Sequence, residues 1–205
     1  MRFRVAPGSK HKTGFFLDQR ENRRMLAELC TGKRVLDLCC HSGGFGIYAA
    51  VRGQAAEVTG VDLDEEALAL AAENARLNRV AVRWVQADIF PWLRDALRYG
   101  KTFDVVVLDP SKQTRSREDV EAACKKYLDM NRLALQVVER GGVLLTCSCT
   151  GLVSEERFLD IIRHAGRLTQ RQLQIFRLSG AAPDHPFYAH VPEGRYLKCA
   201  WCRVW

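Results

Sequence analysis

Apolar and polar positions alternate along the chain in a pattern that predicts strands and helices in turn. Short apolar runs rich in β-branched residues predict strands at 34–38, 57–62, 80–86, 103–108 and 143–147. Amphipathic stretches around them predict helices at 17–29, 45–51, 63–76, 91–99, 119–139 and 155–165. Two strand-like segments follow, at 171–178 and 196–205. This order predicts an α/β fold: a doubly wound, mostly parallel sheet with an antiparallel C-terminal hairpin.

Two glycine features punctuate this pattern. The pair Gly141-Gly142 is expected to stop the long helix at 119–139.

The segment Arg34–Gly46, with the sequence RVLDLCCHSGGFG, joins the first strand to the next helix. A strand, a glycine-bearing turn and a helix open a βαβ unit, because glycine lets the backbone turn sharply and approach a ligand. Asp62 ends the second strand, where an acid can accept hydrogen bonds from ribose hydroxyls. We therefore expect this turn to bind a cofactor that contains adenosine. The alternative is an α/β domain without a nucleotide, in which the glycines form an ordinary turn.

The spacing of the glycines favours one cofactor class. Folds that bind dinucleotides need G-x-G-x-x-G, whereas Gly43, Gly44 and Gly46 are spaced differently. Asp37 ends the first strand just before the turn. Its carboxylate would attract the ammonium and sulfonium groups of S-adenosylmethionine (SAM) but would repel a diphosphate. We therefore expect SAM.

Polar side chains occur where the predicted strands end. Ligands of doubly wound sheets bind at the carboxyl ends of the strands, so these residues predict the site. They are Asp37, Asp62, Asp88, Asp109 and Cys149. Asp88 ends the third strand, from which it can reach an adenine amino group.

Asp109 and Cys149 are the candidate catalytic residues. The turn Asp109-Pro110 is stiffened by proline, and its carboxylate can accept hydrogen bonds from an amino group of cytosine or adenine. The simpler alternative is that this pair only ends a strand. Cys149 closes the run TCSC and is a candidate nucleophile. It would add to C6 of a pyrimidine and turn C5 into the carbon that takes the methyl group of SAM.

Cys147 is the alternative thiol. Two residues apart on a strand, Cys147 and Cys149 share a face, and geometry alone does not separate them. We favour Cys149, which lies further toward the cofactor edge, and expect Cys147 to pack in the core. The thiolate is the reactive form, and Lys112 or His185 is expected to lower the pKa of the thiol.

Composition and charge indicate the kind of partner. The 205 residues fit one domain with a small appendage. The net charge of +7 and the pI of about 9.1 favour an anionic partner, with nucleic acid as the default candidate, over a merely basic enzyme. Arginines and lysines interleave with phenylalanines near the N-terminus. We divide the chain into a basic arm with the start of the first helix, 1–24, and a SAM-dependent methyltransferase domain, 25–205.

Targeting segments and cysteine spacing indicate where the protein is located and whether it binds a metal. There is neither a signal peptide nor an apolar run that could cross a membrane, so we expect a cytoplasmic protein without membrane contact. The sequence leaves the oligomeric state open. Cys199 and Cys202 form the only C-x-x-C pair, and three positions apart on a strand they face opposite ways. We therefore predict no metal site.

Six segments, in order along nearly the whole chain, carry a resemblance to a known family. They are HKTGFFLDQRENR (11–23), VLDLCCHSGGFG (35–46), VVVLDPSK (105–112), GGVLLTCSC (141–149), DHP (184–186) and PEGRYLKC (192–199). They resemble the bacterial 5-methylcytosine methyltransferases of large-subunit ribosomal RNA, which are class I, Rossmann-like SAM enzymes. The resemblance implies transfer of a methyl group from SAM to C5 of cytosine in RNA, most directly ribosomal RNA.

The resemblance also implies site residues. The last cysteine of the family's T-x-S-C run is the nucleophile, which corresponds to Cys149. The residues implied around the cofactor are Gln19, Asp37, Cys39, His41, Gly43, Gly44, Asp62, Asp88 and Asp109. The proton acceptor stays open among Asp184, His185 and Glu193.

The sequence departs from the family in two respects. We expect the family's N-terminal PUA domain and β-hairpin region to be missing, in which case either the basic arm binds RNA or the substrate differs. Ser111 replaces a proline in the family's Asp-Pro-Pro-Lys turn. Two other functions therefore stay open: SAM-dependent methylation of a nitrogen or a small molecule, and an RNA-binding relic without activity.

Overall fold

The computed structural model of the chain describes residues 1–5 and 14–205. Lys10, His11 and Lys12 of the predicted basic arm lie outside this range. The described strands are β1 (Arg34–Leu38), β2 (Glu57–Asp62), β3 (Arg83–Gln86), β4 (Phe103–Leu108), β5 (Val138–Ser148), β6 (Leu173–Ser179) and β7 (Lys198–Val204). They form one sheet in the order β3-β2-β1-β4-β5-β7-β6, in which β7 is antiparallel to both of its neighbours and the other adjacent pairs are parallel. The predicted fold class is confirmed.

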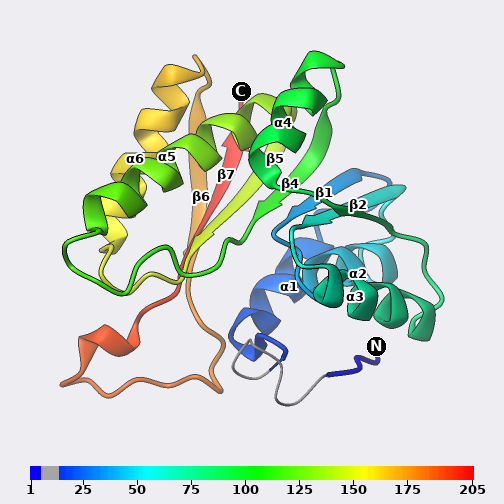
Figure 1. The fold of residues 1–205 in the computed structure, drawn as a ribbon, viewed down its shortest axis with the longest axis horizontal. Coiled ribbons are helices and arrows are strands. Elements are labelled where there is room, and N and C mark those ends of the chain that lie inside the picture. Colours follow the sequence, from blue (N-terminus) through cyan, green and yellow to red (C-terminus); the bar gives the residue numbers. More distant parts are fainter. Residues whose placement is uncertain (6–13) are drawn as a thin grey trace.

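Helices cover both faces of the sheet (Figure 1). One side carries α1 (Arg20–Ala27), α2 (Gly44–Val51) and α3 (Glu65–Leu77), and the other carries α4 (Ile89–Arg98), α5 (Val120–Val137) and α6 (Glu155–Leu168). Two short 3₁₀ turns, η1 (Leu17–Gln19) and η2 (Pro192–Gly194), complete the described elements. Among the described helices, none combines the length and the apolar character needed to cross a membrane.

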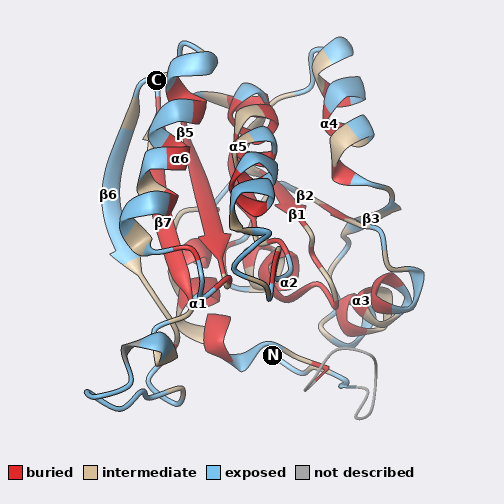
Figure 2. Ribbon diagram, turned by 60° about the vertical axis from the view of Figure 1, so that its left-hand side comes forward, coloured by how far each residue is buried: buried red, intermediate tan, exposed pale blue. Residues whose placement is uncertain are grey.

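Strand side chains alternate between two apolar cores, one under each helical layer. Leu36 and Leu38 of β1 face the core under α4–α6, whereas Val35 faces the core under α1 and α2. Cys199 and Cys202 likewise belong to opposite cores, as predicted. Figure 2 shows the buried central strands and the exposed edge strand β6.

The glycine pair after α5 has a different role from the predicted one. The helix ends earlier, at Val137, and β5 starts directly at Val138. Gly141 and Gly142 therefore lie inside the strand, where the pairing with β4 shifts its register. Gly141 has a φ of +76°, and a Cβ at Gly142 would stand 2.8 Å from the Asp104 carbonyl oxygen. The glycines permit a bulge in the sheet rather than a helix stop.

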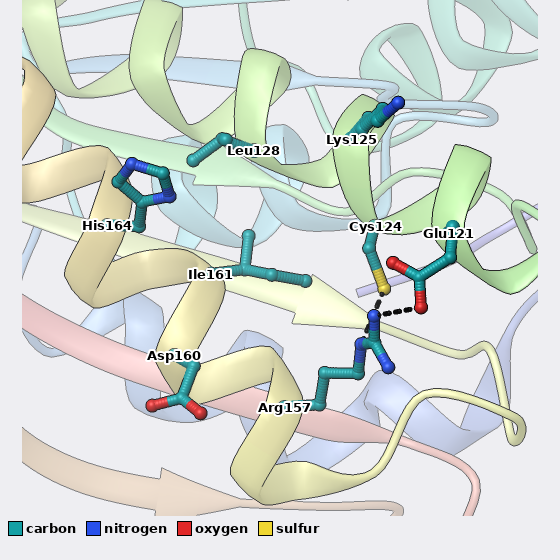
Figure 3. Close-up of a pocket in the computed structure, with 8 residues that line it drawn as sticks. All are labelled: Glu121, Cys124, Lys125, Leu128, Arg157, Asp160, Ile161 and His164. Carbon is teal, nitrogen blue, oxygen red and sulfur yellow. Dashed lines mark hydrogen bonds and ion pairs between the residues drawn. The ribbon is translucent and has the colours of Figure 1, made fainter.

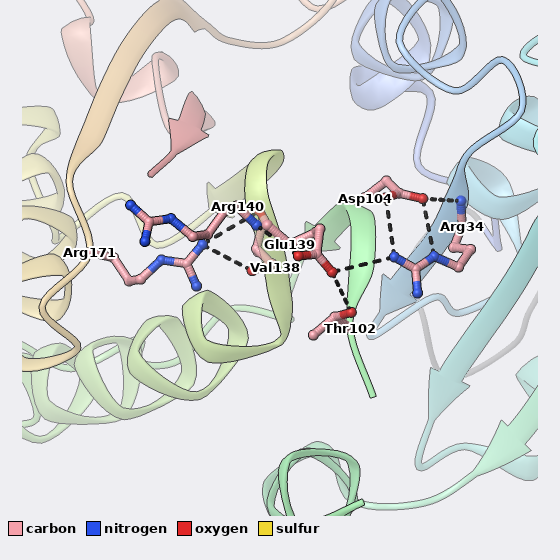
Figure 4. Close-up of polar contacts among 7 residues, drawn as sticks. All are labelled: Arg34, Thr102, Asp104, Val138, Glu139, Arg140 and Arg171. Atoms are coloured by element: carbon pink, nitrogen blue, oxygen red, sulfur yellow. Dashed lines mark hydrogen bonds and ion pairs between the residues drawn. The ribbon is translucent and has the colours of Figure 1, made fainter. Parts of the chain in front are cut away.

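The carbonyl groups at the end of α5 are instead bound by Arg171, which follows α6 in the chain. The guanidinium of Arg171 donates to the carbonyls of Leu135 at 3.2 Å and Val138 at 3.0 Å, and its Nε donates to the carbonyl of Trp205 at 3.1 Å. Figure 4 shows the guanidinium beside Val138. A cation that satisfies orphan carbonyls at a helix C-terminus explains how α5 ends without a glycine cap.

The first residues of the chain lie along α3. Asn78 accepts from the Arg2 amide at 2.9 Å, and the buried Asn74 accepts from the Arg4 amide at 2.6 Å. The Asn74 amide also donates to the Ser42 carbonyl at 3.2 Å. One buried side chain thus ties the N-terminal segment to the glycine-bearing turn.

Candidate active site

The turn after β1 has an unusual backbone. Cys39, His41 and Gly43 all have positive φ values, of 59°, 48° and 81°. A Cβ at Gly43 would stand 2.5 Å from the ring of Trp84, so both the backbone conformation and the space require glycine here. Residues held in such sparsely populated backbone conformations cluster at ligand-binding sites.

Asp62 and Asp88 lie at the tips of neighbouring strands, as predicted, and both also bind the backbone. Asp62 accepts from the His41 amide at 2.8 Å and from the Asp64 amide at 3.0 Å. Asp88 is exposed and accepts from the Phe90 amide at 2.8 Å, which makes it the N-cap of α4. Both carboxylates keep further lone pairs for a ligand.

Arg23, which lies within the predicted basic arm 1–24, is a further candidate site residue. Its guanidinium is buried and lies 4.4 Å from the centroid of the Phe15 ring and 5.6 Å from that of Phe45. A Cβ at Gly44 would stand 2.5 Å from its Nε. Among the described residues, Nε and Nη1 of Arg23 and Oδ1 of Asp37 have no hydrogen-bond partner although they are buried. Buried polar groups without partners cost stability and so indicate a ligand.

Asp37 is fully buried beneath this arginine. Its Oδ2 accepts from the Gly46 amide at 2.8 Å. Burial raises the pKa of its carboxyl to about 7, opposed by the Gly46 hydrogen bond and by Arg23, while the negative charge of Asp109 raises it further. A cationic ligand would bring this carboxyl back to its charged form.

Asp109 follows β4, next to the tip of β1. Burial of its carboxyl raises the pKa to about 6; Arg23 lowers it, Asp18 raises it, and the Gln19 amide lowers it. Gln19 is itself buried and reaches this carboxyl from η1. A carboxyl with a pKa near neutrality can both give and take a proton.

Cys149 lies at the tip of β5. Its thiol donates to the Pro110 carbonyl over 3.8 Å, so the nucleophile candidate lies against the Asp-Pro turn. Burial raises the pKa of this thiol to about 11, and the charges of Asp109 and Asp18 raise it further. Cys147 is fully buried in the core under α1 and α2, against which Cys149 also packs. The predicted shared face is confirmed.

The cation beside this thiol is one that the sequence analysis missed. Lys198, at the start of β7, lowers the pKa of Cys149, whereas Lys112 and His185 do not figure among the charges that shift it. A lysine at the head of the apolar strand KCAWCRV was the available signal.

The three candidate proton acceptors lie in the long loop between β6 and β7. Asp184 accepts from Arg20 at 2.8 Å and lies 3.1 Å from Nδ1 of His185, and both neighbours lower the pKa of its carboxyl. Glu193 lies exposed in η2. A cavity of about 540 Å³ opens here, lined among others by Phe187, His185 and Arg195.

A second cavity, of about 430 Å³, opens between α5 and α6 (Figure 3). Arg157 crosses it and donates to the Cys124 sulfur at 3.1 Å and to Glu121. It contains none of the predicted site residues. In the part of the chain that the structure describes, no group of three or more potential ligands could hold a metal ion.

The residues at the strand tips fit SAM. The unpaired atoms of Arg23 and Asp37 match in charge the carboxylate and the ammonium of its methionine moiety. A seven-stranded sheet of this order with such a turn defines a class I SAM-dependent methyltransferase.

The chain belongs to the S-adenosylmethionine-dependent methyltransferase family, whose sequence model matches residues 1–174. Its cofactor is SAM. The chain is 46% identical over 191 residues to ribosomal RNA large subunit methyltransferase I of Aeromonas hydrophila, which covers 92% of the chain and 48% of that relative. The enzyme of the same name from Shewanella frigidimarina is 42% identical over 198 residues, covering 95% and 50%. The chain thus spans about half the length of these relatives.

Solved structures agree with the fold. The crystal structure of SMU.776 complexed with SAH has a TM-score of 0.88 at 24% identity and covers 98% of this chain and 53% of that chain. NSun6 from Pyrococcus horikoshii, solved with SFG, has a TM-score of 0.70 at 20% identity and covers 97% and 56%. At these identities the likeness concerns the fold alone.

Proposed function

We propose that this chain transfers a methyl group from SAM to C5 of a cytosine in RNA, with Cys149 as the nucleophile. The observation that carries the proposal is the contact between two strand tips: the Cys149 thiol lies against Pro110, beside Asp109, a carboxyl whose pKa is raised to about 6. Methylation of a nitrogen needs no thiol, whereas methylation of a pyrimidine carbon does.

Ribosomal RNA is the proposed substrate. The relatives named above are ribosomal RNA methyltransferases, and the chain carries a net charge of +7. The loop between β6 and β7 presents exposed rings at Phe187 and Tyr188, on which unpaired bases could stack. RNA as the partner thus rests on charge, exposed aromatic rings and the relatives' names.

The geometry supports a set of residues that would hold SAM. Arg23 and Asp37 would bind the charged groups of its methionine moiety, and Asp62 and Asp88 would bind ribose and adenine. The remaining predicted residues would contribute through the backbone of the turn or by packing: Gln19, Cys39, His41, Gly43 and Gly44. Bound SAM supplies the methyl group that C5 accepts.

The protein groups would act on the base in two stages. In the first, the Cys149 thiol releases its proton to solvent and its sulfur bonds to C6, while protonated Asp109 donates its own proton to N3 of the cytosine. In the second, after C5 has been methylated, a base removes the C5 proton, the C6–S bond breaks to release the Cys149 thiolate, and N3 returns its proton to Asp109. Asp184, His185 and Glu193 are the candidates for that base.

One observation favours a second candidate function. The pKa of the Cys149 thiol is raised to about 11, so little thiolate exists at neutral pH. Methylation of a nitrogen, or of a small molecule, would need no thiolate and would leave Cys149 dispensable.

Trapping tests the proposal. The protein is incubated with SAM and with ribosomal RNA that contains 5-fluorocytidine, and the product is run on a denaturing gel. Fluorine at C5 cannot leave as a proton does, so we expect a covalent protein–RNA band that is absent in Cys149→Ala. Cys147→Ala is the matched control and should still form the band. Wild-type protein that binds SAM but gives no band, and Cys149→Ala that still methylates RNA, would each favour the second function.

A further inference from the structure

The residues on both sides of Cys149 are held by buried hydroxyl groups. The Ser148 hydroxyl donates to the Tyr127 phenol at 3.1 Å. The Thr150 hydroxyl lies 2.9 Å from the same phenol and accepts from the Gln113 amide at 3.0 Å. Ser148, Thr150 and Tyr127 are all fully buried. The network joins the tip of β5 to the segment that follows the Asp-Pro turn, so it fixes the backbone around the thiol.

Lys198 adds to this hydrogen-bond network from the neighbouring strand β7. It stands opposite Ser148 in the register of β5 and β7. Its ammonium donates to the carbonyls of Thr150 at 2.7 Å and Val153 at 2.8 Å, which form the turn directly after Cys149. Only 5% of Lys198 is exposed. Burying an ammonium is costly, and neither acceptor carries a full charge to offset that cost.

The Lys198 ammonium has one N–H group that binds neither of these carbonyls. An ammonium has three N–H groups, and among the described residues the two carbonyls are the only acceptors of Lys198. One N–H donor and the full positive charge of Lys198 are therefore left at the end of β5. A thiolate that forms at Cys149 would accept from this donor and balance this charge.

We propose that Lys198 is a positioning residue for Cys149: it holds the turn after the thiol and stabilises the thiolate from which the reaction starts. The inference rests on the proposed function. In chemical terms, the S–H bond breaks, the proton leaves to solvent, and the negative charge on sulfur faces the ammonium until the C6–S bond forms.

The charges around both groups support this assignment. Lys198 and Cys149 each favour the charged form of the other, while burial lowers the pKa of Lys198 to about 8. Near pH 7 the amine is therefore mainly protonated and acts as a cation. The other groups that act on the thiol are Asp109 and Asp18, and the thiol in turn acts on Tyr127 and Tyr196. The other groups that act on Lys198 are Cys199, Glu155 and Lys112. Lys198 thus provides the positive charge that opposes two carboxylates.

The pH profile of thiol alkylation tests the inference without RNA or SAM. The protein is treated with iodoacetamide at a series of pH values, and alkylation of the Cys149 peptide is followed by mass spectrometry. Lys198→Met should shift the profile up by about one pH unit, which is a tenfold slower reaction at a fixed pH. Lys198→Arg should keep most of the reactivity, and Lys101→Met, at an exposed site, should match the wild type.

Two comparisons make the outcome decisive. Lys198→Gln keeps a hydrogen-bond donor but removes the charge. It serves in place of Lys198→Met if the methionine variant has a lowered Tm or does not bind SAM. Profiles that coincide with the wild type in these neutral variants would overturn the inference. The trapping gel separates the two proposals: a shifted profile without any wild-type adduct defeats only the cytosine-5 function, whereas a wild-type adduct with an unshifted profile defeats only the role of Lys198.

Discussion

The guanidinium of Arg23 lies so close to Gly44 that a Cβ at this glycine would stand 2.5 Å from Nε. Gly44 is the first residue of α2 and Arg23 lies in α1, so the two helices approach each other closely at the turn after β1. Glycine is needed at this position for close approach, since Gly44 has an ordinary helical backbone.

Gly44→Ala should therefore displace Arg23 and weaken SAM binding by about tenfold or more. The added methyl group cannot be accommodated without moving a guanidinium that is stacked on Phe15. Isothermal titration calorimetry with SAM measures the effect. Gly151→Ala is the control, since a Cβ there meets only Tyr196, at 3.9 Å, and should leave the affinity unchanged.

Arg23→Met should nearly abolish SAM binding but leave the fold intact. Methionine keeps the apolar packing between the two phenylalanine rings and removes the two unpaired donors. The neighbouring Arg24 is exposed, so Arg24→Met should bind SAM like the wild type. Equal SAM affinities in the two variants would contradict the role given to Arg23.

Asp37→Asn should stabilise the SAM-free protein at pH 8 and remove part of its pH dependence. Because the folded pKa of Asp37 is raised to about 7, the folded state binds a proton more tightly than the unfolded state does. Its contribution is therefore fully present below the unfolded pKa and lost as the pH rises through about 7. The gain at pH 8 amounts to at most about 4 kcal/mol, from roughly 3 pKa units. Urea unfolding at pH 5 and 8 measures it, and SAM affinity should fall in the same variant.

Arg171→Met should destabilise the protein by about 2 kcal/mol without changing SAM affinity, because three carbonyls at the end of α5 and at Trp205 lose a charged donor. Thermal melting should show a fall in Tm of about 4 °C. Arg167→Met, in the exposed last turn of α6, serves as the control. A stable Arg171→Met protein would show that water satisfies these carbonyls equally well.

The sequence predicted the strand tips well, because each tip follows a local apolar run. Asp37, Asp62, Asp88 and Asp109 all lie where the strand pattern placed them. The same pattern could not place Cys149 relative to its cation, because that cation is 49 residues away in a strand whose neighbours are set by the whole sheet.

Long-range contacts explain the remaining differences. Asp18 and Asn22 lie near the start of the first helix but bind distant segments: Asp18 accepts from the Tyr196 hydroxyl at 2.7 Å, and Asn22 accepts from the Ser179 hydroxyl at 2.7 Å. The helix begins at Arg20 without a side-chain cap. Similarly, a basic segment indicates RNA on composition alone, whereas only tertiary structure reveals that Arg23 is buried.

The position of β7 has a consequence for how the protein folds. β6 precedes β7 in the chain but reaches the sheet only through it, since β7 lies between β5 and β6. Because β7 lies between these two strands, it must pair with both of them to complete the sheet. Lys198 is the first residue of the inserted strand. The thiol of Cys149 would therefore acquire its neighbouring cation only when the sheet closes.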